Sequence, residues 1–223
     1  LKSQERKIKE LKQRKSKLET KYYKKAEILS DKRQAYAREL EDEIKAEFQD
    51  LSMKETYIKI DFSKKEQPSA AGIDAVEFLI STNPGEGLKP LTKIASGGEL
   101  SRIMLALKTI TAEIDMVDTL VFDEVDSGVG GKTAQRMAEK LAAAADRRQV
   151  ICITHLPQIA SIADHNYLID KETRDERTYT SIKDLEVEEK KEEVARMLAG
   201  SKKTETAREH AEEMLTFARD KKQ

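Results

Sequence analysis

The sequence is poor in cysteine, proline, glycine and aromatic residues. Its 223 residues include one cysteine, four prolines, nine glycines and no tryptophan. The single cysteine, Cys152, excludes a disulfide framework and favours a reducing compartment, and its place in an apolar run predicts a core residue. No apolar run approaches membrane-spanning length and no signal peptide opens the chain. We therefore expect a cytoplasmic protein without membrane contact and with one large domain.

An excess of charge of one sign is also missing. Lysine and arginine number 41 against 42 aspartates and glutamates, which leaves a net charge of -1. A nucleic-acid-binding domain usually carries a basic surplus, and the whole chain shows none. The excess is local, because residues 1–25 are rich in lysine and arginine and residues 186–193 are acidic. A basic helix can touch a phosphate backbone, although a run of charge is more often a solvated face.

The first 51 residues contain neither proline nor glycine. Apolar residues recur there at intervals of three, four and seven, the spacing of a coiled coil. They are Leu1, Ile8, Leu11, Leu18, Tyr22, Leu29, Tyr36, Leu40, Ile44, Phe48 and Leu51. Lys15, Lys25 and Lys32 fall on the same stripe, so we expect no tight autonomous dimer. A continuous helix of this length spans about 75 Å and must project to find a partner helix.

Beyond this arm, strand and helix patterns alternate, which predicts an α/β fold with parallel pairing. The expected strands are residues 56–62, 75–80, 119–122, 149–154, 167–169 and 179–182. The expected helices are residues 99–114, 132–145, 158–163, 187–198 and 205–219. We expect the first two strands to form a β-hairpin closed by a loop at residues 63–72, and the last two to form an edge hairpin. Gly200 separates the final helices.

The strand at residues 119–122 ends in two adjacent carboxylates, Asp123 and Glu124. Such a pair often marks only the start of a loop. At the carboxyl end of a buried strand, however, the first acid can hold Mg²⁺ and the second can orient a water molecule.

Two other segments carry polar groups in the order that a nucleotide site needs. Ser96, Gly97, Gly98 and Glu99 precede a helical pattern; they are either a simple N-cap or a cradle in which a hydroxyl, glycine amides and the helix dipole hold a phosphate. His155 follows an apolar strand and is either satisfied by a backbone carbonyl or part of a site. Together with the acidic pair, these segments predict half of an ATP-hydrolysing site.

The phosphate loop G-x-x-x-x-G-K-[ST] is absent, although residues 126–133 come close to it. Asp126 stands where the first glycine belongs, so we interpret Gly131, Lys132 and Thr133 as the start of a helix. Without the loop's lysine and backbone amides, the β- and γ-phosphates have no holder. The chain alone should not hydrolyse ATP efficiently.

Several separated runs resemble the RecN family of bacterial DNA repair proteins, in the SMC-like branch of the ABC ATPases. The resemblance extends from Thr56 onward, and the arm matches only as a coiled coil. The runs are residues 72–78, 83–85, 95–102, 122–131, 153–158, 196–200 and 207–211.

This resemblance implies a division at residue 52. Residues 1–52 would be the returning strand of a coiled-coil arm, and residues 53–223 the C-terminal lobe of an ABC/SMC-type ATPase head. The amino-terminal lobe of the same protein would supply the phosphate loop. The resemblance further implies ATP and Mg²⁺ as cofactors, a homodimer formed through ATP-bound heads, and DNA as a partner. The function implied is DNA double-strand break repair and recombination at the nucleoid, in the bacterial cytoplasm.

The resemblance also implies a role for each motif. Asp123 would bind Mg²⁺, Glu124 would be the general base and His155 would contact the γ-phosphate. A signature loop, Ser96, Gly97, Gly98 and Glu99, would hold the γ-phosphate of the other head's ATP. Glu99 stands where many ABC proteins carry glutamine, and Gly130 where the superfamily usually places an aspartate.

Two other functions remain open at this point. One is a transporter-type ATPase subunit, which the long arm disfavours because such subunits couple to membrane partners through short helices. The other is a coiled-coil scaffold with an inert head. Replacing Glu124 with glutamine separates an ATPase from a scaffold, since only the ATPase should trap closed dimers.

Overall fold

The computed structural model describes residues 2–94, 96–112, 114–174, 177–200 and 204–221. Leu1 of the predicted apolar stripe therefore lies outside the described residues. The chain forms two compact units: Leu1–Ala46 with Glu55–Lys93, and Glu47–Lys54 with Ile94–Gln223. We call them the first and the second unit. The functional division predicted at residue 52 stays a prediction.

Most of the arm belongs to the first unit, in helix α1 (Lys2–Asp50), so the predicted long helix is confirmed. Every side chain from residue 4 to residue 21 is exposed. Among them are Ile8, Leu11 and Leu18, each more than half exposed. An apolar stripe without a neighbour fits the expectation that this part of the helix requires a partner.

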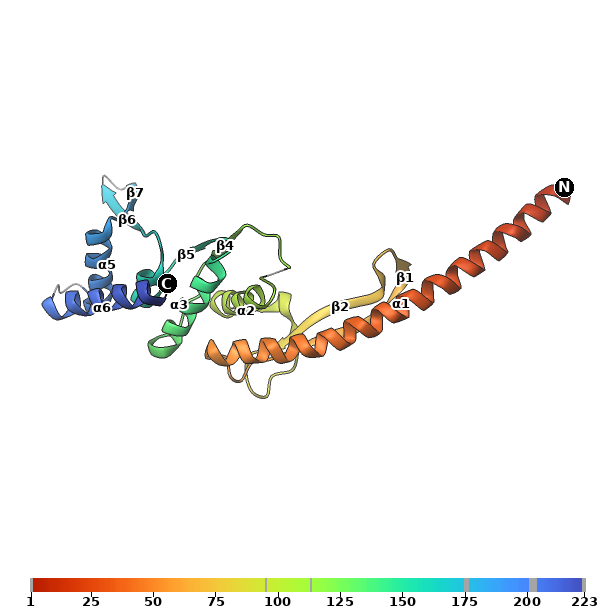
Figure 1. The fold of residues 1–223 in the computed structure, drawn as a ribbon, viewed down its shortest axis with the longest axis horizontal. Helices are drawn as coiled ribbons and strands as arrows, with labels where there is room; N and C mark the ends of the chain where they lie inside the picture. Colours follow the sequence, from red (N-terminus) through yellow and green to blue (C-terminus); the bar gives the residue numbers. More distant parts are fainter. Residues whose placement is uncertain (1, 95, 113, 175–176, 201–203, 222–223) are drawn as a thin grey trace. The chain divides into compact units, whose positions relative to one another are not determined.

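A β-hairpin lies beside α1 in the first unit (Figure 1). Strand β1 (Tyr57–Ser69) pairs antiparallel with β2 (Gly72–Ser81), to which the short β3 (Lys89–Pro90) and the 3₁₀ helix η1 (Leu91–Lys93) are added. The hairpin is confirmed, but the loop predicted at residues 63–72 is wrong, because β1 continues to Ser69. The Tyr22 hydroxyl donates to the Ser69 carbonyl at 3.0 Å and accepts from its N–H at 3.1 Å, which holds the extension on the helix.

The face of α1 that meets the hairpin carries a buried polar contact. The Asp74 carboxylate accepts hydrogen bonds from the Ser30 hydroxyl at 2.7 Å and from Arg33 Nη1 at 3.0 Å. Asp74 is 6% exposed, and Ser30 and Ala37 on α1 are also buried. The Ser30 hydrogen bond and then the Arg33 guanidinium outweigh burial and lower the pKa of Asp74. The hairpin is therefore fixed to the arm by a charge-assisted contact.

The second unit contains the predicted alternation. Helix α2 (Gly97–Ile110) leads to β4 (Thr119–Phe122), and α3 (Gly131–Ala145) leads to β5 (Gln149–Cys152) and α4 (Pro157–Ile162). Strands β4 and β5 are parallel, with Phe122 opposite Cys152, so the predicted parallel pairing is confirmed. The mixed α/β fold with a long N-terminal helix is likewise confirmed.

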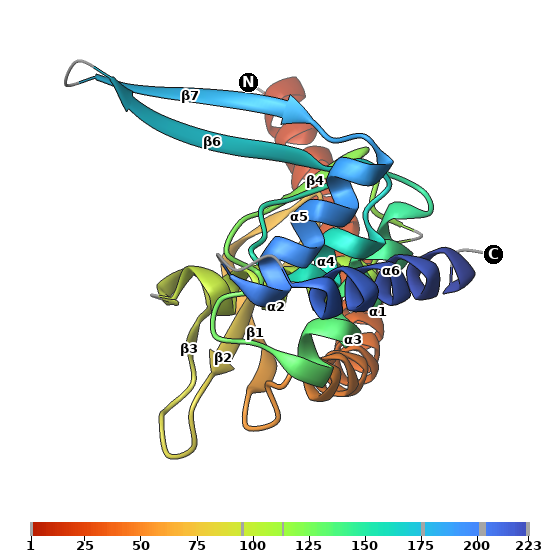
Figure 2. The same cartoon turned by 90° about the vertical axis from the view of Figure 1, so that its left-hand side faces the viewer.

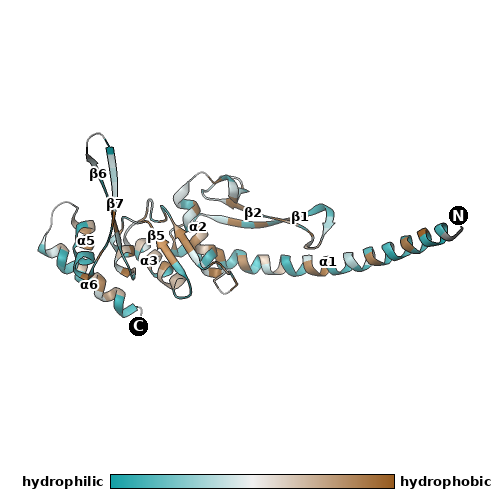
Figure 3. Cartoon of the chain, turned by 90° about the horizontal axis from the view of Figure 1, so that it is seen from above, coloured by the Kyte–Doolittle hydropathy of each residue, from teal (hydrophilic) through white to brown (hydrophobic). Residues whose placement is uncertain are grey.

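The sequence predicts a buried strand at residues 119–122, but the structure buries only one face of β4. Leu120 and Phe122 are buried, whereas Val121, Ile151 and Ile153 are 64%, 46% and 52% exposed. Figure 3 shows the corresponding hydrophobic colour on β5. Within the described residues, nothing covers the second face of this two-stranded sheet.

The last turn of α1 and the following residues pack with α3 in the second unit. Lys140 Nζ of α3 lies 2.7 Å from a Glu47 carboxylate oxygen and 3.0 Å from one of Asp50. Burial opposes the charge of Lys140, but the hydrogen bonds to these acids outweigh it and raise its pKa. Met137 on the same helix is fully buried.

The carboxyl-terminal elements follow the prediction closely. Strands β6 (Tyr167–Arg174) and β7 (Arg177–Asp184) form an antiparallel hairpin that projects from the neighbouring helices (Figure 2). Helices α5 (Val187–Ala199) and α6 (Glu205–Lys221) form a small apolar core with α4. Its buried members are Ala160, Val194, Ala195, Ala207 and Ala211.

Across the described ranges, no helix combines the length and the apolar character needed to cross a membrane.

Candidate functional site

The signature loop forms the beginning of α2. The Ser96 hydroxyl accepts a hydrogen bond from the Glu99 N–H at 3.4 Å and so caps the helix. The helix starts at Gly97, two residues earlier than predicted, because this cap brings both glycines into the first turn. It ends at Ile110 instead of residue 114, because Thr111 caps it and the Ala112 N–H donates to the Thr109 carbonyl, three residues back instead of four. The amides of Gly97 and Gly98, at the first two positions of the helix, lack helical acceptors and are suited to an anion.

The acidic pair follows β4 in a strained turn. Glu124 has a φ of 55°, in the left-handed region that residues with a side chain seldom adopt. The Ser127 N–H donates to the Glu124 carbonyl at 3.0 Å and closes the turn. The side chains of Asp123 and Glu124 are exposed. Backbone strain of this kind costs of order 1–3 kcal/mol and is found mainly at functional sites.

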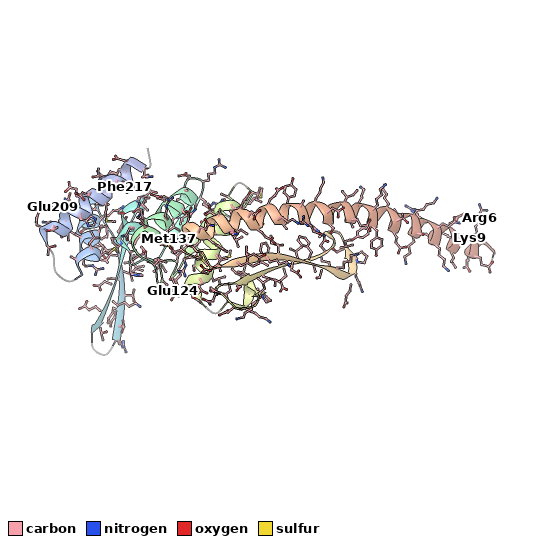
Figure 4. All side chains as sticks on the ribbon, turned by 90° about the horizontal axis from the view of Figure 1, so that it is seen from below. Arg6, Lys9, Glu124, Met137, Glu209 and Phe217 are labelled. Carbon is pink, nitrogen blue, oxygen red and sulfur yellow. The ribbon has the colours of Figure 1, made fainter. Side chains whose placement is uncertain are left out.

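The signature loop and the acidic turn touch each other. A Cβ added to Gly98 would stand 3.0 Å from the Glu124 carbonyl oxygen and 2.9 Å from Ser127 Cβ. A Cβ added to Gly97 would stand 2.8 Å from Glu124 Oε2. Figure 4 labels Glu124 in this part of the second unit. Both glycines therefore allow a close approach that a larger residue would hinder.

Two residues of α2 hold the acidic turn from the side. The Ser101 hydroxyl donates to the Asp123 carbonyl at 2.6 Å, and Arg102 Nη1 donates to the Ser127 carbonyl at 2.7 Å. Burial lowers the pKa of Arg102, and the nearby charge of Glu99 opposes this shift. The sequence analysis gave neither residue a role. Their spacing of three and four residues from Gly98, which places all three on one helix face, is the signal that could have found them.

His155 is joined to the acidic turn through Asp126. The Asp126 carboxylate accepts from the Thr154 hydroxyl at 2.5 Å and from the His155 N–H at 2.9 Å, and His155 Nδ1 lies 3.2 Å from it. Asp126 is 3% exposed, whereas the His155 side chain is 72% exposed. A carboxylate, not a backbone carbonyl, therefore orients the imidazole. Asp126 also has no role in the sequence analysis, although its place three residues after Asp123 on the same turn marks it.

Cys152 is the last residue of β5, opposite Phe122, and is close enough to Asp126 and Asp123 to be affected by their charges. Its side chain is partly exposed, so the predicted core position is confirmed only in part. Burial, reinforced by the charges of Asp126 and Asp123, raises the pKa of Cys152 to about 12. The side chain is consequently a neutral thiol near pH 7.

The remaining predicted positions are placed as follows. Lys132 and Thr133 lie at the start of α3, as predicted, and the Thr133 hydroxyl contacts the Ser52 hydroxyl. Glu99 is half-buried in the first turn of α2. Among the described residues, no three histidine, cysteine, aspartate or glutamate side chains cluster to hold a metal ion. A magnesium ion at Asp123 would thus need water and phosphate oxygens as its other ligands.

The chain is similar to proteins named DNA repair protein RecN. It is 46% identical over 194 residues to that of Halalkalibacterium halodurans, with 85% of this chain and 34% of the relative covered. It is 44% identical over 205 residues to that of Bacillus subtilis, with 85% and 36% covered. The chain is a RecN homologue. This confirms the family that the motifs indicate, and the chain spans about a third of the length of the RecN proteins it matches.

Comparison with models of known protein families finds no match. Among solved structures, the Smc head domain with a coiled coil and joint from Pyrococcus yayanosii is similar, with a TM-score of 0.49 and 22% identity over 85% of this chain and 36% of that chain. The Smc head domain from Pyrococcus furiosus bound to the C-terminal domain of ScpA is similar with a TM-score of 0.45 and 20% identity, over 81% of this chain and 45% of that chain.

Proposed function

We propose that this chain is the C-terminal half of an SMC-like ATPase that acts in DNA double-strand break repair and recombination. Its likeness to proteins named DNA repair protein RecN supports the biological role. The observation that carries the biochemical role is the strained Glu124 turn, held by α2 on one side and linked through Asp126 to His155 on the other. These are the groups that phosphoryl transfer to water requires at one place.

The amino-terminal turn of α2 is suited to a phosphate. Ser96, Gly97 and Gly98 would hold the γ-phosphate of the ATP bound to a second head, through a hydroxyl and amides at the positive end of the helix. The Glu124 carboxylate now lies against Gly97 and would have to turn away, which its exposure permits. Glu99 lies near Arg102, and its carboxylate would change the electrostatic potential at this turn.

The acidic turn would serve the other ATP site of the dimer. Asp123 would bind Mg²⁺, directly or through water, and Glu124 would accept the proton of the attacking water. His155 would donate to the γ-phosphate from Nε2. The Asp126 carboxylate, which faces Nδ1, would orient the ring for this contact.

The missing half of the site would come from the amino-terminal lobe of the same protein. The exposed apolar face of β4 and β5 is a surface for that lobe, because a two-stranded parallel sheet with one bare face is otherwise unusual. The lobe would supply the phosphate loop and complete the ATP and Mg²⁺ sites. ATP-bound heads would then form a homodimer that acts on DNA at the nucleoid of the bacterial cytoplasm.

The long arm favours this proposal over a transporter subunit. From residue 4 to residue 21 every side chain of α1 is exposed, and a subunit that couples through short helices has no need of such a segment. A scaffold with an inert head remains the alternative that the experiment must exclude.

The decisive experiment is ATP turnover by this chain co-expressed with an amino-terminal lobe that carries a phosphate loop. We expect turnover by the complex and none by the chain alone. Glu124→Gln should abolish turnover and accumulate ATP-dependent dimers, because it keeps the shape of the site and removes the base. Glu209→Gln, at an exposed position on α6, is the matched control and should behave like the native protein. A well-folded complex without turnover, with or without DNA, would support the scaffold instead.

A further inference from the structure

The exposed part of α1 has two chemically different sides. In a heptad register Ile8, Tyr22 and Leu29 occupy position a, and Leu11 and Leu18 position d. Ile8, Leu11 and Leu18 form the seam that a partner helix would cover, whereas Tyr22 and Leu29 already lie against the hairpin. The partner would also reach the flanking e and g positions and leave positions b, c and f facing water.

The side away from the seam is basic. Lys9 occupies position b, and Lys17 and Lys24 position c, and all three are exposed. Among residues 4–25 the acid on this side is Glu10, which is paired with Arg6 at 3.2 Å. In the part of the chain that the structure describes, no carboxylate forms an ion pair with Lys9, Lys17 or Lys24. Figure 4 shows Arg6 and Lys9 near the amino-terminal end of α1, away from the hairpin.

The charge of this segment departs from that of the whole chain. Residues 4–25 contain ten lysines and arginines and three glutamates, whereas the full sequence has a net charge of -1. An ordinary solvated helix face mixes the two signs, since neighbouring opposite charges stabilise it. A face of one sign is self-repelling, and a polyanion is the partner that relieves this repulsion.

We propose that the outer row Lys9, Lys17 and Lys24 of α1 binds the phosphate backbone of duplex DNA. The proposal rests on the proposed function, because it locates the DNA partner named there. The row extends over about 22 Å at 1.5 Å per residue, the length of roughly six or seven base pairs. Contacts to phosphate alone give binding without sequence preference, as repair of breaks at any sequence requires.

The positions of the cations on α1 distinguish DNA from the competing partner, which is an acidic helix. An acidic partner helix would pair with the flanking cations at position g, which are Lys7, Arg14 and Lys21. DNA would instead use the outer row, which the seam's partner leaves open. Two triple variants with the same change of charge therefore test the two partners against each other.

The test compares Lys9→Gln/Lys17→Gln/Lys24→Gln with Lys7→Gln/Arg14→Gln/Lys21→Gln in the full chain. Glutamine is a good helix former, so circular dichroism should show the same helix content for both. Binding to a fluorescent duplex of about 30 base pairs is measured by anisotropy over a range of salt concentrations. We expect the outer triple to lose about tenfold or more in affinity at low salt, and its log K against log salt slope to fall by about 2 to 3. The flanking triple should lose about threefold or less.

Three results would overturn the proposal: no DNA binding by the native chain, equal loss from both triples, or no loss from the outer triple. A fourth is an outer triple that weakens association with the amino-terminal lobe instead of with DNA, which would make a protein the occupant. DNA-free ATP turnover of the two-lobe complex should be unchanged in the outer triple. A failed DNA test with intact turnover thus removes this proposal and leaves the ATPase standing.

Discussion

At the scale of single residues, we expect alanine at Gly97 and alanine at Gly98 to lower the free energy of unfolding by different amounts. A methyl group at Gly98 meets the Glu124 carbonyl and Ser127 Cβ, so the acidic turn must move. A methyl group at Gly97 meets the mobile end of the Glu124 side chain. We expect Gly98→Ala to lower the free energy of unfolding by about 1–3 kcal/mol and Gly97→Ala by less than about 1 kcal/mol. Chemical denaturation measures both, and equal costs would contradict the close approach described here.

Asp126 predicts the state of the His155 ring. Because the carboxylate faces Nδ1, we expect ¹⁵N NMR to show the Nδ1-protonated tautomer in the neutral ring. Asp126→Asn should shift the ring toward the Nε2-protonated form and lower ATP turnover of the two-lobe complex by about tenfold or more, since the ring loses the carboxylate that orients it. His165 and His210, the other two histidines, serve as internal references. An unchanged His155 spectrum would remove Asp126 from this positioning role.

Cys152 predicts a pH dependence. Its pKa is raised to about 12 in the folded protein, above the ordinary value of 9.0, so folding favours the protonated thiol. The free energy of unfolding should therefore fall as the pH rises above about 9, because the unfolded chain loses this proton first. Iodoacetamide should label the native chain slowly at pH 8 and the denatured chain rapidly. Rapid labelling of the native chain would show that the thiol is not held in this environment.

At the scale of elements, the hairpin of β1 and β2 depends on one buried carboxylate. Asp74→Asn weakens the contacts from Ser30 and Arg33, and we expect the hairpin to open more easily by about 1–3 kcal/mol. Hydrogen exchange of the β1 and β2 amides measures this opening. Asp61→Asn, at an exposed position on β1, is the control and should leave exchange unchanged.

The same carboxylate gives a second pH effect, opposite in direction to that of the thiol. The pKa of Asp74 is lowered from 3.8, so its stabilising contribution is present above that pH and is lost as the pH falls through the folded value. Protection of the hairpin amides should accordingly decrease in acid. The Asp74→Asn variant should lack this part of the pH dependence.

At the scale of the whole molecule, the bare face of the parallel strands predicts how the isolated chain behaves. Val121 and Ile151 lie opposite each other and expose apolar surface. We expect Val121→Thr/Ile151→Thr to reduce self-association in light scattering at little cost in stability, because threonine keeps the β-branched shape. The same variant should bind the amino-terminal lobe more weakly. Unchanged binding would place the lobe on another surface.

Local patterns in the sequence are enough to predict most elements of the second unit. The helices α3, α5 and α6 and the parallel pairing of β4 with β5 follow from hydrophobic spacing and from strand and helix alternation. Motif order indicates Ser96, Asp123 and His155 as candidate site residues, and their roles stay predictions. These features depend on residues close together in the chain, whose preferences are readable directly.

The sequence by itself determined that α1 is a long helix and that strands and helices alternate, and it indicated which motifs are candidates for the chemistry, because periodicity and residue type act locally. Only the tertiary structure decided that β1 continues to Ser69, because the Tyr22 hydroxyl that fixes it is 47 residues away. It alone brought Arg102 and His155 to the acidic turn, since these contacts join groups on different elements. Exposure of Val121 is equally a tertiary property, because burial depends on what lies across the sheet and not on the residue itself.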